Sequence, residues 1–372
     1  MSNLSGISVV LPSLNPDEKL LAVIDGLLQY GFTDIILVND GSAAENLHYF
    51  ETAATHPEVH LLHHEVNRGK GAALKTAFAW FLENRPNAVG VVTVDGDNQH
   101  HAEDTRSCAL HMQETGNLTL GVRDFSQSDV PMRSRTGNRI TSTVFKIFVG
   151  MTISDTQTGL RAIPRADLKI LNKVLGDRFE YETNMLLSMK ENDIPFDEVK
   201  IRTVYIEENK SSHFHPIRDS WRIYKLILAH FFKYTVSSLL SSVIDTGLYV
   251  LLAWALSGLL NDPLLTTVSI TAARIISSVV NFFMNQKLVF KSKLSTGKSM
   301  LRYGILAVVI FLGQLALTYG TYLLFGISES QIFLRGSVYV IVMTALFVVS
   351  FLAQQRWVFA NKRNAKNEVF QK

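Results

Sequence analysis

The chain has 372 residues, 47% of them hydrophobic, and a formal net charge of +3. Its charge is uneven: residues 1–220 hold 21 Lys and Arg against 29 Asp and Glu, whereas residues 221–372 hold 15 against 4. Long apolar runs begin where acidic residues become rare, which excludes a chain that is soluble along its whole length. The single cysteine, Cys108, excludes an internal disulfide.

Short apolar, β-branched segments alternate with helical patterns through the first part of the chain. The predicted strands are residues 7–11, 34–39, 59–63, 89–94 and 117–122, and the predicted helices between the first four are 16–30, 45–54 and 69–83. This alternation predicts a mainly parallel α/β sheet with helices on both faces. Ligands of such sheets bind beyond the carboxyl ends of the strands. The polar residues that follow the strands are therefore the candidate site.

Four polar segments follow these strands. Residues 12–18 (PSLNPDE) follow the first strand, and Asn15 is expected to cap the helix after it. Residues 39–42 (NDGS) follow the second strand, and residues 95–99 (DGDNQ) follow the fourth. Residues 67–71 (NRGKG) begin the helix after the third strand, where glycines and free N–H groups suit an anionic ligand. Alone, each segment is an ordinary turn or helix start, so their order and spacing carry the information.

Four apolar stretches dominate the second part of the chain. They cover residues 235–257, 264–284, 303–325 and 332–353. About 20 residues is the length that a helix needs to cross a bilayer. Lys and Arg gather between the second and third stretches and beside both ends, while the loops 258–263 and 326–331 have none. This pattern places the soluble part and both chain ends in the cytoplasm.

A repeat of 69 residues runs through the membrane part. Residues that this offset matches are Tyr234 and Tyr303, Asp245 and Gln314, Leu248 and Leu317, Gln286 and Gln355, and Val289-Phe290 with Val358-Phe359. The repeat predicts a duplicated two-helix hairpin. Residues 354–357 (QQRW) resemble the Gln-x-x-Arg-Trp motif of processive polysaccharide synthases but are one residue short. Because the offset matches them to residues 285–288 (NQKL), we interpret both segments as a repeated helix end.

Two opposite charges lie within the first two apolar stretches, Asp245 and Arg274. Ionisable groups inside a bilayer are costly and usually face other polar groups. We expect them to form a structural pair, with a role in handling a lipid phosphate as the alternative.

In order and spacing, the four polar segments resemble family 2 glycosyltransferases with the GT-A fold, a Rossmann-like α/β domain, over about residues 6–230. Residues 67–71 and 154–161 (SDTQTGLR) make the likeness closest to polyprenyl-phosphate glycosyltransferases such as dolichol-phosphate mannose synthases. Residues of about 230–360 resemble the GtrA-like four-helix membrane domain. The resemblance implies a GT-A domain (1–216), an interfacial amphipathic helix and linker (217–233), a membrane domain (234–361) and a cytoplasmic tail (362–372).

The resemblance also implies which residues bind the donor and catalyse transfer. The nucleotide-sugar would contact Pro12, Asn15, Asp40, Lys70 and Asp95, with Asp40 placed for base or ribose contacts. The catalytic set would be Asp95, Asp97, Asp155 and Gln157, and Mg²⁺ or Mn²⁺ would be held by Asp95, Asp97 and Gln99. Oxygen ligands suit these ions, which neutralise charge on a nucleoside-diphosphate leaving group. Where the family often has aspartate this chain has Asn39, which leaves the donor base undetermined.

The acceptor phosphate is expected to contact Arg123, Arg133, Ser134 and Lys210, with ordinary surface charges, or a flexible linker at Lys210, as the alternative. The predicted reaction is inverting transfer from a GDP-mannose or UDP-glucose type of donor to a polyprenyl phosphate, at the cytoplasmic face of the cell inner membrane. The acceptor is already anionic, so positioning and electrostatics replace a strong general base. The alternatives are a diacylglycerol-type acceptor and a lipid-linked sugar transporter. No nucleic acid partner is expected, and homo-oligomerisation is left open.

Overall fold

The computed structural model describes residues 4–127, 130–202, 224–225, 228–292 and 294–360. Lys210, the predicted tail at 362–372 and most of the predicted interfacial helix at 217–233 lie outside these residues. Contacts divide the chain into two compact units, with the boundary along the sequence between Ile227 and Leu228. Each unit is described by itself.

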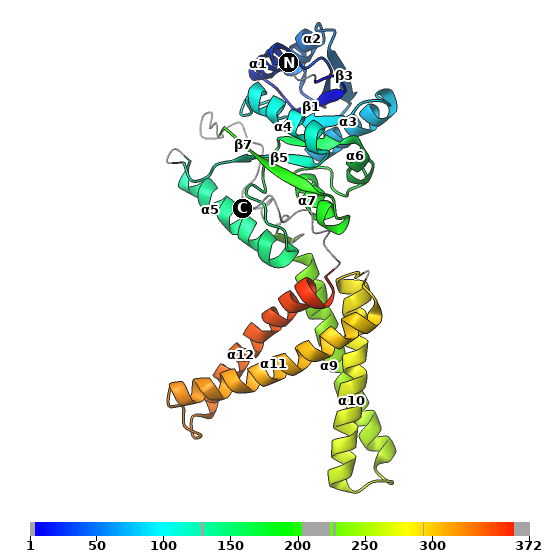
Figure 1. The fold of residues 1–372 in the computed structure, drawn as a ribbon, viewed down its shortest axis with the longest axis vertical. Coiled ribbons are helices and arrows are strands. Elements are labelled where there is room, and N and C mark those ends of the chain that lie inside the picture. The colour runs from blue at the N-terminus through cyan, green and yellow to red at the C-terminus, as the bar shows by residue number, and fades with distance from the viewer. Residues whose placement is uncertain (1–3, 128–129, 203–223, 226–227, 293, 361–372) are drawn as a thin grey trace. The chain divides into compact units, whose positions relative to one another are not determined.

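The first unit contains one sheet of seven strands (Figure 1). The strands are β1 (Ile7–Ser13), β2 (Ile35–Asp40), β3 (Val59–His64), β4 (Gly90–Thr93), β5 (Leu118–Arg123), β6 (Arg161–Pro164) and β7 (Phe196–Ile201). Their order is β3-β2-β1-β4-β6-β5-β7, and β6 is antiparallel to both β4 and β5, while the other neighbours are parallel. The predicted mainly parallel α/β sheet is confirmed, with two strands, β6 and β7, that the sequence reading missed.

Helices cover both faces of this sheet, as predicted. They are α1 (Lys19–Gln29), α2 (Leu47–Ala53), α3 (Lys70–Asn84), α4 (Ala102–Thr115), α5 (Met132–Val144), α6 (Arg165–Leu171) and α7 (Glu180–Glu191), with a 3-10 turn at Ala44–Asn46 and a π-turn at Phe145–Val149. Successive side chains of a strand point to opposite faces. Accordingly, Val10 packs in a core with Phe78 of α3 and Tyr181 of α7, whereas Val9 packs in a second core with Ile24 of α1.

The predicted cap at Asn15 is wrong. Helix α1 begins at Lys19, and Asn15 has a φ of +48° outside any helix. Its Oδ1 accepts a hydrogen bond from the Ala43 N–H at 2.8 Å, and its own N–H donates to Ser42 Oγ at 2.8 Å. The segment after β1 is therefore bonded to the turn after β2, and these tertiary contacts replace the local capping geometry.

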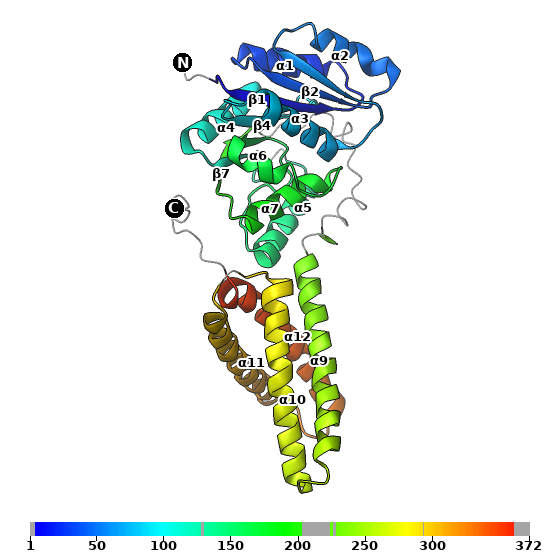
Figure 2. The same ribbon diagram turned by 90° about the vertical axis from the view of Figure 1, so that its right-hand side faces the viewer.

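The second unit contains four helices that are long and apolar enough to cross a membrane. They are α9 (Ala229–Leu256), α10 (Asp262–Met284), α11 (Thr296–Leu324) and α12 (Ile332–Ala353). Helices α9 and α10 run side by side as one hairpin (Figure 2), and α11 pairs with α12. The four predicted membrane spans are thus present, and the chain is an integral membrane protein.

The 69-residue repeat is visible in the structure. Helix α10 ends in a π-turn at Asn285–Val289, and α12 ends in an equivalent π-turn at Gln354–Val358, which confirms the repeated helix end. Residues at matched positions contact each other: Asn285 Nδ2 donates to Gln354 Oε1 at 3.0 Å, and the Phe290 and Phe359 rings stack with centroids 5.2 Å apart. The two hairpins are therefore in contact at their π-turn ends through residues that the repeat matches.

Candidate functional site

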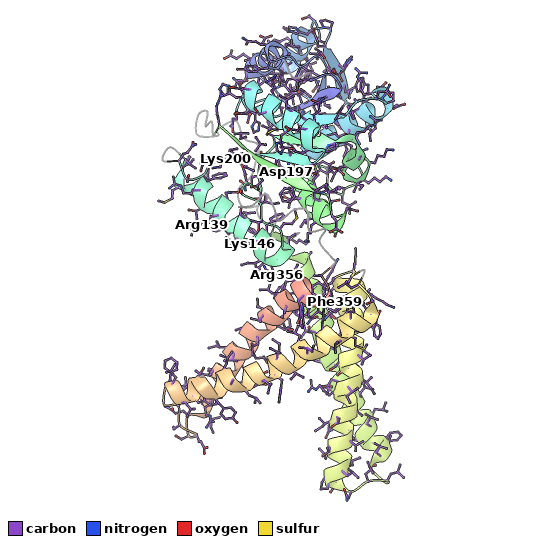
Figure 3. The ribbon with its side chains drawn as sticks, in the orientation of Figure 1. Arg139, Lys146, Asp197, Lys200, Arg356 and Phe359 are labelled. Carbon is purple, nitrogen blue, oxygen red and sulfur yellow. The ribbon has the colours of Figure 1, made fainter. Side chains whose placement is uncertain are left out.

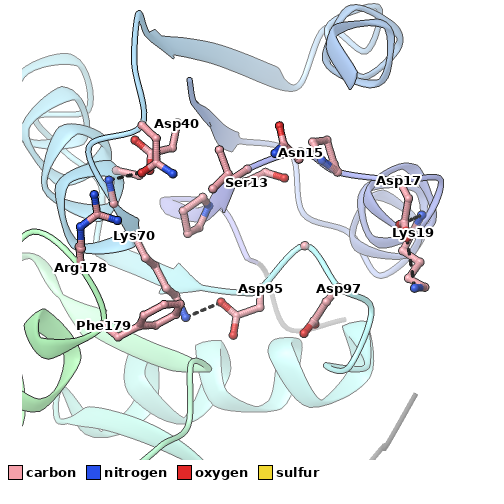
Figure 4. Close-up of a pocket in the computed structure, with 17 residues that line it drawn as sticks. Ser13, Asn15, Asp17, Lys19, Asp40, Lys70, Asp95, Asp97, Arg178 and Phe179 are labelled. Atoms are coloured by element: carbon pink, nitrogen blue, oxygen red, sulfur yellow. Dashed lines mark hydrogen bonds and ion pairs between the residues drawn. The ribbon is translucent and has the colours of Figure 1, made fainter. Parts of the chain in front are cut away.

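A cavity of about 370 Å³ lies at the carboxyl ends of β1, β2 and β4 (Figure 4). The residues that line it come from all four predicted polar segments, from the first turns of α1 and α3 and from the turn before α7: Pro12, Ser13, Leu14, Asn15, Pro16, Asp17, Lys19, Asp40, Asn67, Gly69, Lys70, Ala73, Asp95, Gly96, Asp97, Arg178 and Phe179. Parallel strands bring their carboxyl ends to one edge of a sheet. That geometry gathers residues that are far apart in the sequence.

Asp40 holds the segment at 67–71 in place. Its carboxylate accepts hydrogen bonds from the Arg68 N–H at 3.0 Å and from the Gly69 N–H at 2.8 Å. The imidazole of His64 lies 2.7 Å from the same carboxylate and 2.9 Å from Thr76 Oγ1 of α3. Asp40 is only 3% exposed. Two of the N–H groups that were predicted to bind an anionic ligand, those of Arg68 and Gly69, thus donate to the Asp40 carboxylate instead.

The turn after β2 has room only for glycine at position 41. Its φ is +73°, and a β-carbon there would lie 2.3 Å from the backbone carbon of Val66. This close approach brings the turn at 39–42 against the start of the 67–71 segment. The Asp40 hydrogen bonds therefore depend on a backbone contact that a larger residue would block.

Lys70 joins two carboxylates at the floor of the cavity. Its Nζ lies 2.7 Å from Asp95 Oδ1 and 3.1 Å from Glu182 Oε1 of α7. Burial lowers the pKa of Lys70, but the charges of Asp95 and Glu182 outweigh burial and raise the pKa overall. Burial alone would raise the pKa of Asp95. The charges and hydrogen bonds of Lys70 and His100 outweigh burial and hold this pKa well below its ordinary value. The two ions therefore stabilise each other's charged form.

Asp97 lies two residues beyond Asp95, where the chain turns after β4. Burial and the charge of Asp95 raise the pKa of Asp97. Carboxylate oxygens suit a hard divalent cation, and such a cation would remove the repulsion between these two groups. Within the described residues no three His, Cys, Asp or Glu side chains are grouped as a complete ligand set. The pair of carboxylates fits a divalent ion that takes its remaining ligands from elsewhere, such as the donor or water.

Asp155 and Arg123 form a second ion pair, at the end of β5. Arg123 Nε donates to Asp155 Oδ2 at 2.7 Å, and Arg123 Nη2 donates to Oδ1 at 3.2 Å. The Asp155 side chain is 0% exposed and that of Arg123 is 19% exposed. Bidentate pairing fixes the plane of the guanidinium. A predicted catalytic residue and a predicted acceptor residue are thus bound to each other.

Arg123 also lines a second cavity, of about 330 Å³, between β5, β7 and α5. Asn138, Ser154, Glu198 and Lys200 line it as well. Glu198 accepts hydrogen bonds from the Ser154 N–H at 2.7 Å and from Ser154 Oγ at 2.6 Å. Figure 3 labels Lys200 on β7 and Arg139 on α5. The cavity therefore combines two cations, Arg123 and Lys200, with two carboxylates, Asp124 and the Glu198 that is bonded to Ser154.

Comparisons with known proteins identify both parts of the chain. Residues 8–171 match the model of the glycosyl transferase family 2, and residues 233–359 match that of the GtrA/DPMS transmembrane domain. The chain carries a family 2 glycosyltransferase domain. It is accordingly a glycosyltransferase, and its second unit is a GtrA/DPMS membrane domain.

Two curated relatives are similar to the glycosyltransferase domain. The UDP-N-acetylglucosamine–dolichyl-phosphate N-acetylglucosaminyltransferase of Methanococcus voltae is 25% identical, over 54% of this chain and 86% of that protein. The undecaprenyl-phosphate 4-deoxy-4-formamido-L-arabinose transferase of Yersinia pestis is 29% identical, over 43% of this chain and 49% of that protein. Among solved structures, the glucosyl-3-phosphoglycerate synthase of Mycobacterium tuberculosis aligns with a TM-score of 0.45 and 17% identity, over 60% of this chain and 77% of that one.

Three residues to which the sequence analysis gave no site role lie beside the predicted ones in the structure: His64, Arg161, which ends the 154–161 segment, and Glu182. His64 was within reach, because it ends the strand that pairs with β2 and the register sets it opposite Asp40. Arg161 is 1% exposed, and it donates from Nε to the Thr158 carbonyl at 3.0 Å and from Nη1 to the Glu182 carbonyl at 2.9 Å. Burial lowers the pKa of Arg161. A fully buried arginine in a strand has no sequence signature, since arginine is normally exposed.

Among the remaining predicted residues whose side chains the structure describes, Gln99, Gln157 and Ser134 are not among those that line the two cavities. The Gln99 N–H nevertheless donates to Asp97 Oδ1 at 3.1 Å. Gln157 is exposed and its N–H donates to Asp155 Oδ1 at 3.0 Å. Ser134 lies in the first turn of α5, as does Arg133, whose side chain is outside the described part of the chain.

Proposed function

We propose that this glycosyltransferase moves a sugar from a nucleotide-sugar donor to a polyprenyl phosphate, with inversion at the anomeric carbon. The observation that carries the proposal is the Asp95–Asp97 pair in a cavity at the sheet edge, within a chain that also has a GtrA/DPMS membrane domain. A membrane domain fused to a sugar-transfer domain suits an acceptor that is itself a lipid. The two named relatives, one acting with dolichyl phosphate and one with undecaprenyl phosphate, support the same acceptor class.

The donor is proposed to bind in the cavity of about 370 Å³, as a GDP-mannose or UDP-glucose type of molecule. Pro12, Asn15 and the 67–71 segment would contact the nucleotide. Asp95 and Asp97, with Gln99 as a further candidate ligand, would hold Mg²⁺ or Mn²⁺. Such an ion, when bound, neutralises charge on the diphosphate leaving group. Lys70 fixes the Asp95 carboxylate beforehand, so little rearrangement is needed when the donor arrives.

The acceptor phosphate is proposed to bind at Arg123, with Lys200 of the neighbouring strand β7 in the same second cavity. Asp155 fixes the direction of the guanidinium and so acts through Arg123, while Arg133, Ser134 and Lys210 remain candidates for further phosphate contacts. The attacking phosphate oxygen is already anionic, which makes alignment the main task of these residues. By the distribution of Lys and Arg around the spans, the reaction would take place on the cytoplasmic face of the cell inner membrane.

The test is sugar transfer in proteoliposomes of the full chain. Radiolabelled UDP-glucose, GDP-mannose and UDP-N-acetylglucosamine are each offered with polyprenyl phosphate or with diacylglycerol, and the lipid product is extracted. We expect label in polyprenyl-phosphate-sugar, loss of label with excess chelator, and loss in Asp97→Asn. The matched control is Asp25→Asn, which changes a carboxylate with a 69% exposed side chain on α1.

The outcomes distinguish the alternatives. Label in diacylglycerol alone would replace the proposed acceptor class. Movement of a preformed lipid-linked sugar across the bilayer, with no transfer from any donor, would indicate a transporter. Full activity of Asp97→Asn, or full activity in chelator, would show that the carboxylate pair does not act through a divalent ion.

A further inference from the structure

An ion pair lies near the middle of two membrane-spanning helices. Arg274 Nη2 of α10 is 3.2 Å from Asp245 Oδ2 of α9, which confirms the pairing expected from the sequence. Ser277 Oγ donates to Asp245 Oδ1 at 2.8 Å. The Asp245 side chain is 20% exposed, but that of Arg274 is 72% exposed. The pair therefore leaves most of the guanidinium facing away from its own hairpin.

Exposing a guanidinium to hydrocarbon at that position carries a large free-energy penalty. A charged side chain at the bilayer centre costs about 2.5–3.5 kcal/mol by insertion measurements, and more by simulation. Arg274 is ten residues from the end of α10 at Met284, or about 15 Å along the axis. That distance is longer than an arginine side chain, so Arg274 cannot reach the interface. It needs a polar partner at its own depth.

Arg274 belongs to a polar stripe that the other hairpin does not have. Thr267, Thr271, Arg274, Ser278 and Asn281 follow one another at spacings of four and three residues, which places them along one face of α10. Thr267, Thr271 and Arg274 are all exposed. The 69-residue offset matches Thr271, Arg274 and Ser278 to Val340, Met343 and Phe347 of α12. The second copy is thus apolar at the three central positions, although it has Ser350 where the stripe has Asn281, so the hairpin fold itself does not require the polar residues around Arg274.

We propose that this stripe on α10, with Asp245 beside it on α9, docks against the same face of a second copy of the chain. Asp245 is the only carboxylate within the four apolar stretches, so a second copy is the partner for Arg274 that the sequence itself supplies. A pair of opposite charges is self-complementary about a two-fold axis: each Arg274 then meets Asp245 of the other copy. Thr and Ser beside the pair allow two helices to approach closely and to form hydrogen bonds.

Disulfide crosslinking of the full chain in native membranes tests the interface. Cys108→Ala first removes the only native thiol. Thr271→Cys then places a thiol in the stripe, and Val340→Cys places one at the matched position of the other hairpin, where Val340 is 53% exposed. After copper-phenanthroline oxidation we expect a product of twice the 41.7 kDa chain mass, with a several-fold higher yield for Thr271→Cys than for Val340→Cys. Adding Arg274→Leu should lower that yield several-fold.

Thr267→Cys and Ser278→Cys cover the case in which one thiol pair has the wrong geometry. Equal yields from the stripe and from Val340→Cys, or no dimer from any of the three stripe positions, would overturn the proposal. A crosslinked product of another mass would overturn it as well, since the stripe would then bind a different membrane protein. Because the stripe positions, Arg274 and Val340 all lie in the membrane domain, and every variant shares the Cys108→Ala background, the comparison of yields is independent of the proposed reaction.

Discussion

Replacing Asp40 with asparagine should release the 67–71 segment rather than change which nucleotide the site prefers. The carboxylate accepts bonds from His64 and from the Arg68 and Gly69 N–H groups, at 2.7, 3.0 and 2.8 Å. Hydrogen bonds to charged groups each contribute about 1.5–3 kcal/mol. Asparagine keeps one acceptor oxygen but turns an N–H₂ donor toward groups that also donate. We therefore expect a loss of about 2–4 kcal/mol in the free energy that holds the segment closed.

Hydrogen exchange of the full chain in detergent measures this loss directly. A change of 2–4 kcal/mol corresponds to a fall of about 30- to 1,000-fold in the protection of the Arg68 and Gly69 amides. Asp25→Asn is again the control, and donor affinity is measured in parallel. Unchanged exchange at 67–71 in Asp40→Asn would refute the reasoning. A shift in preference between UDP-sugars and GDP-sugars with unchanged exchange would instead show that Asp40 contacts the base.

Three further predictions concern buried groups near the site and in the core. A β-carbon at Gly159 would lie 2.3 Å from Asp95 Oδ2, so Gly159→Ala should slow transfer by about 100-fold with little change in melting temperature, as measured by initial rates and thermal unfolding. Lys70→Met leaves two carboxylates without their cation and should cost about 3–5 kcal/mol of stability, and adding Glu182→Gln should restore part of the melting temperature. Burial, and then the charge of Asp104, raise the pKa of Cys108 to about 12. The folded state thus favours the neutral thiol. The stability that this adds is fully present below the unfolded pKa of about 8.5 and is lost as the pH rises toward 12. At a pH of about 8.5 a thiol reagent should therefore label the denatured chain far faster than the native one.

The sequence predicted the elements whose periodicity is strong. The first five strands are apolar runs of the length that a doubly covered sheet needs, and the four spans are marked by length and lack of charge. β7 was missed because it is an edge strand. Half of its sequence, FDEVKI, is charged, and only its last residue is buried, so it has no continuous apolar run. β6 was missed because four residues, which begin with the buried Arg161 and end with a proline, carry no strand signal.

The sequence predicted the acidic residues of the site and two of its cations, Lys70 and Arg123, but not that these cations pair with Asp95 and Asp155. Asp40, Asp95 and Asp155 stand in recognisable segments, but what each of them contacts is decided by strand order and helix packing. The register of β2 with β3 sets His64 opposite Asp40, and the start of α7 brings Glu182 to Lys70. Such partners come from segments with no motif of their own, so a sequence pattern cannot name them.

These pairings explain how several carboxylates can share one sheet edge before any donor is present. Unpaired, they would repel one another, and burial would remove the water that stabilises their charge. Each instead has a cation or N–H groups from another segment: the loop amides and His64 for Asp40, Lys70 for Asp95, and Arg123 for Asp155. Asp97 is the exception, since burial and Asp95 together raise its pKa. Asp97 accepts a hydrogen bond from the Gln99 N–H, but burial and Asp95 outweigh it. The least compensated position is the one where an added cation gains most, which is the physical reason to expect a divalent ion at Asp97 and not at Asp40 or Asp155.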